Sequence, residues 1–202
     1  MAATVQVALR VRPLTAKEQQ EGDGSCVAYI PGQPQIVVNQ EKSFTFDQVL
    51  DPAATQPQVY ERCVAALVDQ FLDGYNATVL AYGQTGSGKT YSMGTAAPVG
   101  SGGGIDDDQS YGIIPRAVSH LFNGLAQRQA EHPDFEFNVD VSFLELYNED
   151  LIDLLNSASR PDNSRRTRVM PSHVTIREDA QGGIVWGGVT HLPANSTHAV
   201  MQ

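Results

Sequence analysis

The chain has 202 residues, of which 41% are hydrophobic and 18% are charged, and its formal net charge is −10. This length suits one domain and could include a second. The sequence has no run of 18 apolar residues, so no transmembrane helix is expected, and its N-terminus lacks the charged and apolar regions of a signal peptide. The acidic balance argues against nucleic-acid binding by the bulk surface, and two distant cysteines, Cys26 and Cys63, favour a reduced intracellular protein.

The first quarter of the chain predicts short strands. Residues 5–11 alternate apolar and polar side chains, which is typical of a half-buried strand that ends at Pro13. Residues 14–25 are polar and predict a loop. Strand-like runs broken by prolines follow in 26–38, and another short alternation occupies 43–47.

A helix and a buried strand are expected next. Thr55 is a good N-cap, Pro57 lies in the first turn and Gln58 stands at the third helical position. The apolar stripe predicts a helix through 59–73. Residues 77–82 are apolar with little alternation, which predicts a strand buried on both faces.

Residues 83–90 read Gly-Gln-Thr-Gly-Ser-Gly-Lys-Thr, the pattern G-x-x-x-x-G-K-[ST] in its strand–loop–helix context. The glycines let the backbone approach phosphates, and the successive N–H groups form an anion-binding concavity. A helix starting at Lys89 adds the positive end of its dipole. Lys89 can reach the β- and γ-phosphates, and Thr90 offers a hydroxyl to the Mg²⁺ that bridges them. The candidate nucleotide-binding residues here are Gly83, Gln84, Thr85, Gly86, Ser87, Gly88, Lys89 and Thr90.

The middle of the chain contains an expected insertion and a second helix. Residues 94–112 are rich in glycine and aspartate and predict a long surface insertion, after which helical periodicity resumes over 113–125. The regular alternation in 135–143 predicts a long strand. A helical or turn segment is expected at 148–155, and 156–168 are polar.

The last segment predicts a hairpin and the start of a helix. Residues 174–177 and 183–190 read as its two strands, with the turn at 181–183. Asn195 or Ser196 is a good N-cap for a short helix at the chain's end. Because such a short helix does not hold alone, we expect the sequence to be partial.

Five segments stand out in chain order: Val7–Leu14 with its R-x-R-P motif, Phe44–Val49, Gly74–Met93, Gly112–Arg116 and Phe143–Glu149. Together they resemble the kinesin motor domain, and the match runs nearly end to end. The residues around Ile113 and Tyr147 are most similar to the kinesin-4 branch. The resemblance implies an α/β fold of the P-loop NTPase type, with a mixed central sheet flanked by helices, in which residues 1–202 form a C-terminally incomplete motor domain.

The same resemblance implies residues for the nucleotide base. Arg10 and Pro13 would border the adenine, and Tyr91 would stack against it. Without the resemblance, Arg10 and Arg12 would be interpreted as a solvated strand face and Tyr91 as a half-buried helix aromatic. The implied ligands are ATP and Mg²⁺, with Thr90 as the metal-contacting residue.

The implied partner is the microtubule, which would place the protein in the cytoplasm on the cytoskeleton, with no nucleic-acid or membrane partner. Three arginines are candidate contacts to acidic tubulin, although a solvated loop is the plainer interpretation. Asp150 falls close to where some motors carry a tubulin-contacting lysine, which weakens that inference. The three arginines are Arg165, Arg166 and Arg168.

The family's two switch motifs, N-x-x-S-S-R-S-H and D-L-A-G-S-E, do not occur in these 202 residues. We therefore assign no catalytic residue and leave ATPase activity open, since hydrolysis, its coupling to movement and dimerisation would need parts outside this sequence. The first hypothesis is the ATP-binding portion of a microtubule motor. The second is a non-motile ATP-binding or microtubule-interacting fragment. Another P-loop enzyme is disfavoured, because an Asn-Lys-x-Asp guanine signature is absent.

Overall fold

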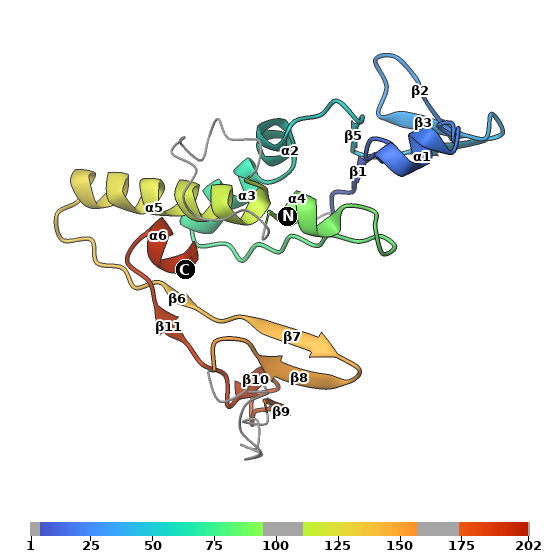
Figure 1. The fold of residues 1–202 in the computed structure, drawn as a ribbon. Coiled ribbons are helices and arrows are strands. Elements are labelled where there is room, and N and C mark those ends of the chain that lie inside the picture. The colour runs from blue at the N-terminus through green and yellow to red at the C-terminus, as the bar shows by residue number, and fades with distance from the viewer. Residues whose placement is uncertain (1–4, 95–110, 157–173, 202) are drawn as a thin grey trace. The chain divides into compact units, whose positions relative to one another are not determined.

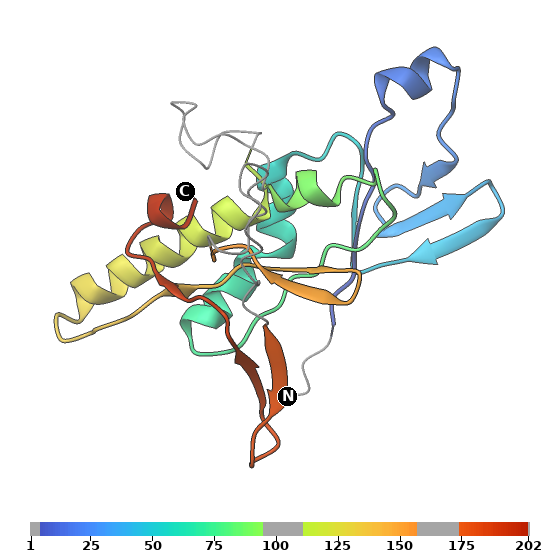
Figure 2. The same cartoon turned by 60° about the horizontal axis from the view of Figure 1, so that its bottom comes forward.

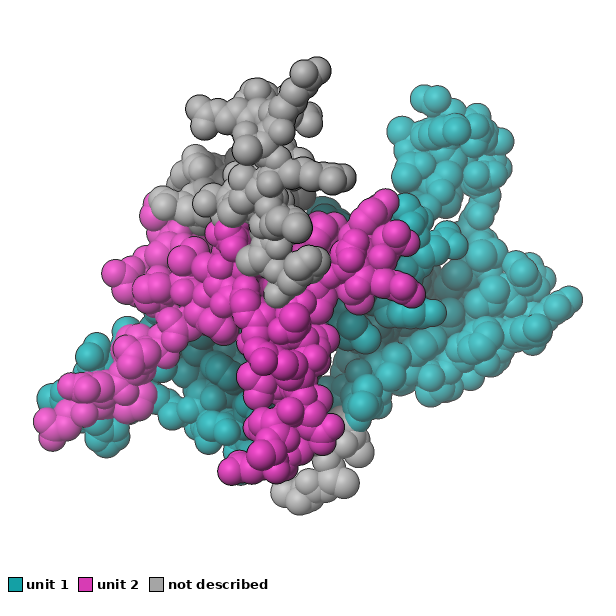
Figure 3. Space-filling model, turned by 90° about the horizontal axis from the view of Figure 1, so that it is seen from below, with its two compact units in different colours: residues 1–133 teal, residues 134–202 magenta. Residues whose placement is uncertain are grey.

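The computed structural model describes residues 5–94, 111–156 and 174–201. The chain divides into two units, residues 1–133 and 134–202 (Figure 3), and each is described by itself. Most of the expected insertion at 94–112 lies outside the described residues. So does most of the polar segment 156–168, with its arginines Arg165, Arg166 and Arg168. The prediction of one partial domain over 1–202 stays a prediction. No described helix is long and apolar enough to cross a membrane.

The strands of the first unit form two small sheets (Figures 1 and 2). Strand β1 (Ala8–Arg10) pairs in parallel with β5 (Gln48–Leu50). The other sheet is antiparallel and has the order β2-β3-β4, in blue in Figure 2. The expected short strands are therefore confirmed, although the first is shorter than its alternation suggests. The three strands of the second sheet are β2 (Val27–Tyr29), β3 (Gln35–Val38) and β4 (Lys42–Thr45).

Helix α1 (Ala16–Gln20) lies where the sequence predicted only a loop, and that prediction is wrong. Thr15 is the N-cap, its side-chain oxygen accepts from the Glu18 amide, and the Glu18 carboxylate accepts from the Thr15 amide. This reciprocal capping box satisfies two of the amides that a helix start leaves free. The T-x-x-E spacing of Thr15 and Glu18 was the overlooked sequence signal.

The helix expected after Thr55 is present but divided. Its capping box between Thr55 and Gln58 is confirmed, with a proline in the first turn. Helix α2 (Gln56–Cys63) ends at Val64, where φ is −130°, and α3 (Ala65–Leu72) begins directly after it. Val64 is 3% exposed, so burial of its side chain stabilises the bend.

Glycines flank the expected insertion: the helix before it ends at Gly94, and the helix after it begins at Gly112. Helix α4 (Lys89–Met93) follows the phosphate-loop motif, and the long helix α5 (Ile113–Glu131) resumes where the periodicity predicted (Figure 1). Gly94 and Gly112 meet backbone to backbone between them. A Cβ on Gly112 would lie 2.5 Å from both the Gly94 amide nitrogen and the Ser92 carbonyl oxygen. Only residues without side chains fit this close approach.

The core of the first unit joins β5 to helices α2 and α5 and to the bend between α2 and α3. Leu50 from β5 packs with Val59 and Tyr60 of α2, Val64 and Ile113 of α5. Buried apolar area of this kind is the main stabilising contribution to such a unit. Polar contacts add to it at one edge, where the Tyr60 hydroxyl lies 2.8 Å from Nδ1 of His120, and Nε2 of His120 lies 3.1 Å from Asp69.

The prediction that residues 77–82 form a strand buried on both faces is wrong. The segment pairs with no strand among the described residues, and Leu80 and Tyr82 are 84% and 96% exposed. Only Val79 packs against the core. An apolar, β-prone run marks a segment that is able to pair, but strand formation depends on neighbours that supply hydrogen bonds and packing.

In its described residues, the second unit has three antiparallel strand pairs and a short helix. The predicted long strand at 135–143 is wrong for most of its length, because only Asp140 and Val141 find a partner. The hairpin expected around 181–183 and the final helix are confirmed. The pairs are β6 (Asp140–Val141) with β11 (Leu192–Pro193), β7 (Leu144–Tyr147) with β8 (Asp150–Asp153), and β9 (Thr175–Glu178) with β10 (Ile184–Gly187); the helix is α6 (Thr197–Met201).

The segment 148–155 turns and then continues as a strand rather than a helix. Asn148 and Glu149 have φ of 50° and 71°, the left-handed values that a two-residue hairpin of type I′ needs at both central positions. Asp153 at the end of β8 is fully buried, and its carboxylate accepts hydrogen bonds from the amides of Leu155 and Thr190. Burial raises the pKa of Asp153, but hydrogen bonds from the Thr190 side chain and from the amides of Thr190, Leu155 and Asn156 outweigh it, so the pKa is lowered.

Candidate functional site

The phosphate-loop motif adopts a tight glycine-dependent turn before α4. Gly83, Gly86 and Gly88 have φ of 154°, 82° and 95°, values that residues with side chains rarely adopt. A Cβ on Gly83 would lie 2.6 Å from Oγ of Ser87. The Ser87 amide donates to the Gln84 carbonyl at 3.2 Å, which closes the turn. The glycine pattern thus has the local role that the sequence indicated.

Lys89, the first residue of α4, reaches back over this turn. Its Nζ donates to the carbonyl oxygens of Gly83 and Gln84, both at 2.8 Å. The ammonium is thereby held against the loop, where it would meet the oxygens of a bound polyphosphate. Thr90 follows on the same helix and is exposed, so its hydroxyl is accessible to a ligand.

At the other side of α4, Arg10 and Tyr91 lie together. The Arg10 guanidinium carbon is 5.1 Å from the centroid of the Tyr91 ring, a cation–π arrangement. Arg10 Nη1 also donates to Oγ of Ser92 at 2.9 Å. Burial lowers the pKa of Arg10, although a guanidinium stays charged in proteins. The interpretation of Arg10 as a solvated strand face is therefore wrong, while Tyr91 keeps 55% exposure.

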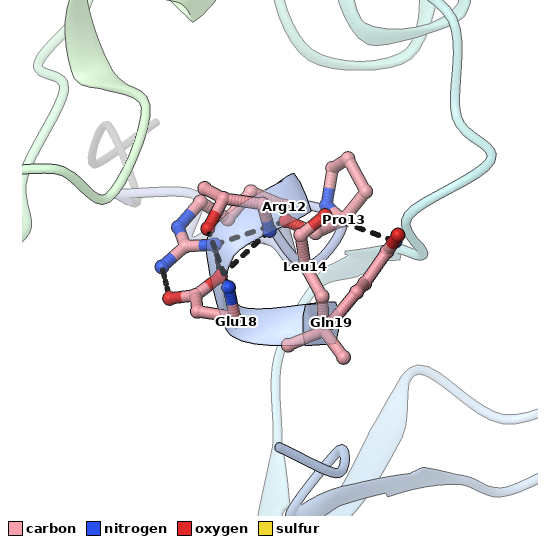
Figure 4. Close-up of polar contacts among 6 residues, drawn as sticks. Arg12, Pro13, Leu14, Glu18 and Gln19 are labelled. Carbon is pink, nitrogen blue, oxygen red and sulfur yellow. Dashed lines mark hydrogen bonds and ion pairs between the residues drawn. The ribbon is translucent and has the colours of Figure 1, made fainter. Parts of the chain in front are cut away.

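Pro13 lies in the exposed turn that leads from β1 into α1 (Figure 4). Arg12 holds this turn: its Nη1 donates to the Pro13 carbonyl at 3.0 Å, and its two terminal nitrogens contact the Glu18 carboxylate at 2.8 and 2.6 Å. Arg12 is therefore paired rather than simply solvated. The hydrogen bonds from Arg12, followed by those from Thr15, lower the pKa of Glu18 to about 2.

Sequence reasoning missed Gln56, which connects these parts. Its side chain contacts both Arg10 and the backbone of Tyr91. A glutamine directly after a helix N-cap carries no distinguishing signal, because such positions are usually exposed. Only the structure shows that this one is buried, at 1% exposure.

The residues present fit a magnesium–nucleotide complex. Mg²⁺ is usually held by one or two protein oxygens together with substrate phosphates and water. No cluster of three or more acidic, histidine or cysteine residues suited to a metal occurs in the described part of the chain. Thr90 offers one such oxygen, since its side chain is exposed near the start of α4. A bound Mg²⁺ would be held by this hydroxyl together with the phosphates and water, and it would neutralise the phosphate charge.

Comparisons with known proteins agree on one family. The model of the kinesin motor domain matches residues 10–202. The chain is 44% identical over 203 residues to the kinesin-like protein KIF21B of Homo sapiens, and 47% identical over 186 residues to the chromosome-associated kinesin KIF4 of Xenopus laevis. These alignments cover 98% and 92% of this chain but only 12% and 14% of the two relatives.

A solved structure gives the same result for the fold. The structure of a fast kinesin, described with its ATPase mechanism and its interactions with microtubules, superposes with a TM-score of 0.80 at 29% identity. The match covers 98% of this chain and 50% of that chain. The α/β motor fold expected from the sequence is therefore confirmed over the part that this chain spans.

Proposed function

The chain belongs to the kinesin motor domain family, and its relatives place it with the kinesin-4 branch; we propose that it forms the ATP-binding part of a microtubule-based motor. The ligand is ATP with Mg²⁺, and the partner is the microtubule, on the cytoskeleton of the cytoplasm. Because the chain spans a small share of its relatives' length, the activity of the whole protein is part of this proposal.

One observation carries the proposal: α4 presents a different group to each end of a nucleotide. At its start, the Lys89 ammonium lies against the phosphate loop. Two residues later, Tyr91 offers an exposed aromatic ring flanked by the Arg10 guanidinium. A triphosphate suits the first end, and a flat base suits the second.

Each residue has a distinct role in this proposal. The amides of Gly83–Gly88 cradle the phosphates, Lys89 neutralises their outer charge, and the Thr90 hydroxyl contacts Mg²⁺. Arg10, Pro13 and Tyr91 border the adenine. The ion pair of Arg12 with Glu18 and the hydrogen bond from Arg12 to the Pro13 carbonyl hold the Pro13 turn in place.

Binding and hydrolysis are separate in this proposal. Phosphoryl transfer depends on positioning the attacking water and on stabilising charge, and both switch motifs that do this in the family are absent from the 202 residues. We therefore expect the chain to bind MgATP without turning it over, with or without microtubules. ATP hydrolysis above background by this chain would contradict the proposal that it binds MgATP without hydrolysing it. Should the protein that contains this chain also lack turnover on microtubules, the non-motile alternative would be favoured.

The binding step is tested by calorimetry of MgATP with the 202-residue chain. We expect Lys89→Ala to abolish measurable binding, because the phosphates lose their nearest fixed positive charge. Lys42→Ala, on the exposed face of β4, removes the same charge elsewhere and should leave affinity unchanged. Equal affinity in wild type and Lys89→Ala, or no ATP binding by the folded wild-type chain, would refute the proposal.

A further inference from the structure

Gln56 is a buried side-chain amide at a junction of three elements. It is the first residue of α2 and is 1% exposed. A buried amide is stable only when its oxygen and its nitrogen both find hydrogen-bond partners. The partners of Gln56 therefore indicate why a polar group occupies this position.

The two ends of the Gln56 amide contact two residues of the proposed adenine site. Oε1 accepts from Nη1 of Arg10 at 2.8 Å, and Nε2 donates to the Tyr91 carbonyl at 2.7 Å. A guanidinium can only donate and a carbonyl can only accept, so the chemistry of the partners fixes the orientation of the amide. Gln56 thus hydrogen-bonds to both neighbours at once. A side chain that is apolar, or that can only donate or only accept, cannot make both contacts.

Both contacts bear on the placement of the aromatic ring. Tyr91 lies in the five-residue helix α4, near whose end the carbonyls depend on partners outside the helix. Its carbonyl is tied to α2 through Gln56, and Arg10, tied to the same amide, lies 5.1 Å from its ring. The amide therefore links β1, α2 and the helix that follows the phosphate loop.

We propose that Gln56 is a positioning residue that holds Arg10 and Tyr91 in the geometry that receives the adenine base. This inference rests on the proposed function. It goes further by separating base recognition from phosphate recognition, because the Gln56 amide contacts Arg10 and Tyr91, the two residues proposed to border the base. Its loss should therefore reduce selectivity for ATP over a bare polyphosphate.

The experiment compares two probes on the 202-residue chain: MgATP and magnesium tripolyphosphate, which lacks the nucleoside. Gln56→Met keeps the length of the side chain but removes both hydrogen bonds. We expect its affinity for MgATP to fall about five- to tenfold, the effect of one net hydrogen bond, because Gln56 acts on the base only through its two partners. Its affinity for tripolyphosphate should stay equal to that of the wild type.

A second variant covers the case in which Gln56→Met fails to fold. Gln56→Asn keeps an uncharged amide but is one methylene shorter, so it cannot span both partners, and we expect the same selective loss of ATP affinity. Gln58→Met is the matched control on the same helix. Gln58 caps α2 through the Thr55 amide, so this variant should lower thermal stability without changing the ratio of the two affinities.

The outcomes separate the two proposals. If the folded wild-type chain binds neither probe, the proposed function fails. If the wild type prefers MgATP and the Gln56 variants lose affinity for both probes equally, Gln56 is only structural and the inference is overturned. Unchanged ATP affinity in both Gln56 variants overturns it as well.

Discussion

Replacing Leu50 by alanine tests the core on which the nucleotide site is built. Leu50 is 1% exposed and belongs to the cluster with Val59, Val64 and Ile113. The substitution removes three buried carbons, worth about 2.4 kcal/mol at roughly 0.8 kcal/mol for each. The residual cavity adds to this cost, so we expect the free energy of unfolding to fall by about 3 kcal/mol.

The matched control is the same substitution at Leu80, which is 84% exposed. Exposed substitutions away from caps and pairs usually change stability by less than about 0.5 kcal/mol. Leu80→Ala should therefore leave the unfolding midpoint almost unchanged. This control also tests the finding that residues 77–82 are exposed rather than buried.

Urea unfolding followed by circular dichroism is the suitable assay, because the longest described helix, the 19-residue α5, belongs to the same unit as Leu50. The midpoint should fall in Leu50→Ala with the slope of the transition preserved. Equal losses of stability in the two variants would refute the reasoning, since they would place Leu80 in a core as complete as that of Leu50.

Three further predictions concern polar contacts. The pKa of Glu18 is lowered from 4.5 to about 2. Its pairing with Arg12 should therefore stabilise the fold above pH 4.5, and this effect should be lost as the pH falls through 2. The difference in urea midpoint between the wild type and Glu18→Gln should shrink over that pH range. Tyr60→Phe removes the hydrogen bond to His120 and should lower the free energy of unfolding by about 1 kcal/mol, whereas an unchanged urea midpoint would contradict this. Thr90→Asn should abolish the gain in ATP affinity that Mg²⁺ provides, measured by calorimetry with and without EDTA, while a retained gain would exclude Thr90 as the metal contact.

Local chemistry made much of this fold predictable. The capping signal at Thr55 and the glycines of the phosphate loop each encode their conformation within a few residues. The positions of α4 and of α5 follow from the same kind of signal. The family resemblance, which depends on spaced motifs, was confirmed as well.

Features that depend on distant partners were not predictable. The apolar run at 77–82 indicated a buried strand, but strand formation depends on neighbours, and none of the described residues pairs with it. The alternation at 135–143 exceeds the two residues that β11 can match. Gln56 escaped notice for the same reason, since Arg10 and Tyr91 are 46 and 35 positions away in the sequence.

The contact between Gly94 and Gly112 has a consequence for how this part of the protein can diverge. Because the two backbones touch, the stretch between them begins and ends at nearly the same point. Doubling such a stretch costs only about 0.6 kcal/mol in closure entropy. Insertions and deletions there should therefore change the free energy of unfolding little. A methyl group on either glycine, in contrast, would separate the two backbones and displace the helix that carries Lys89.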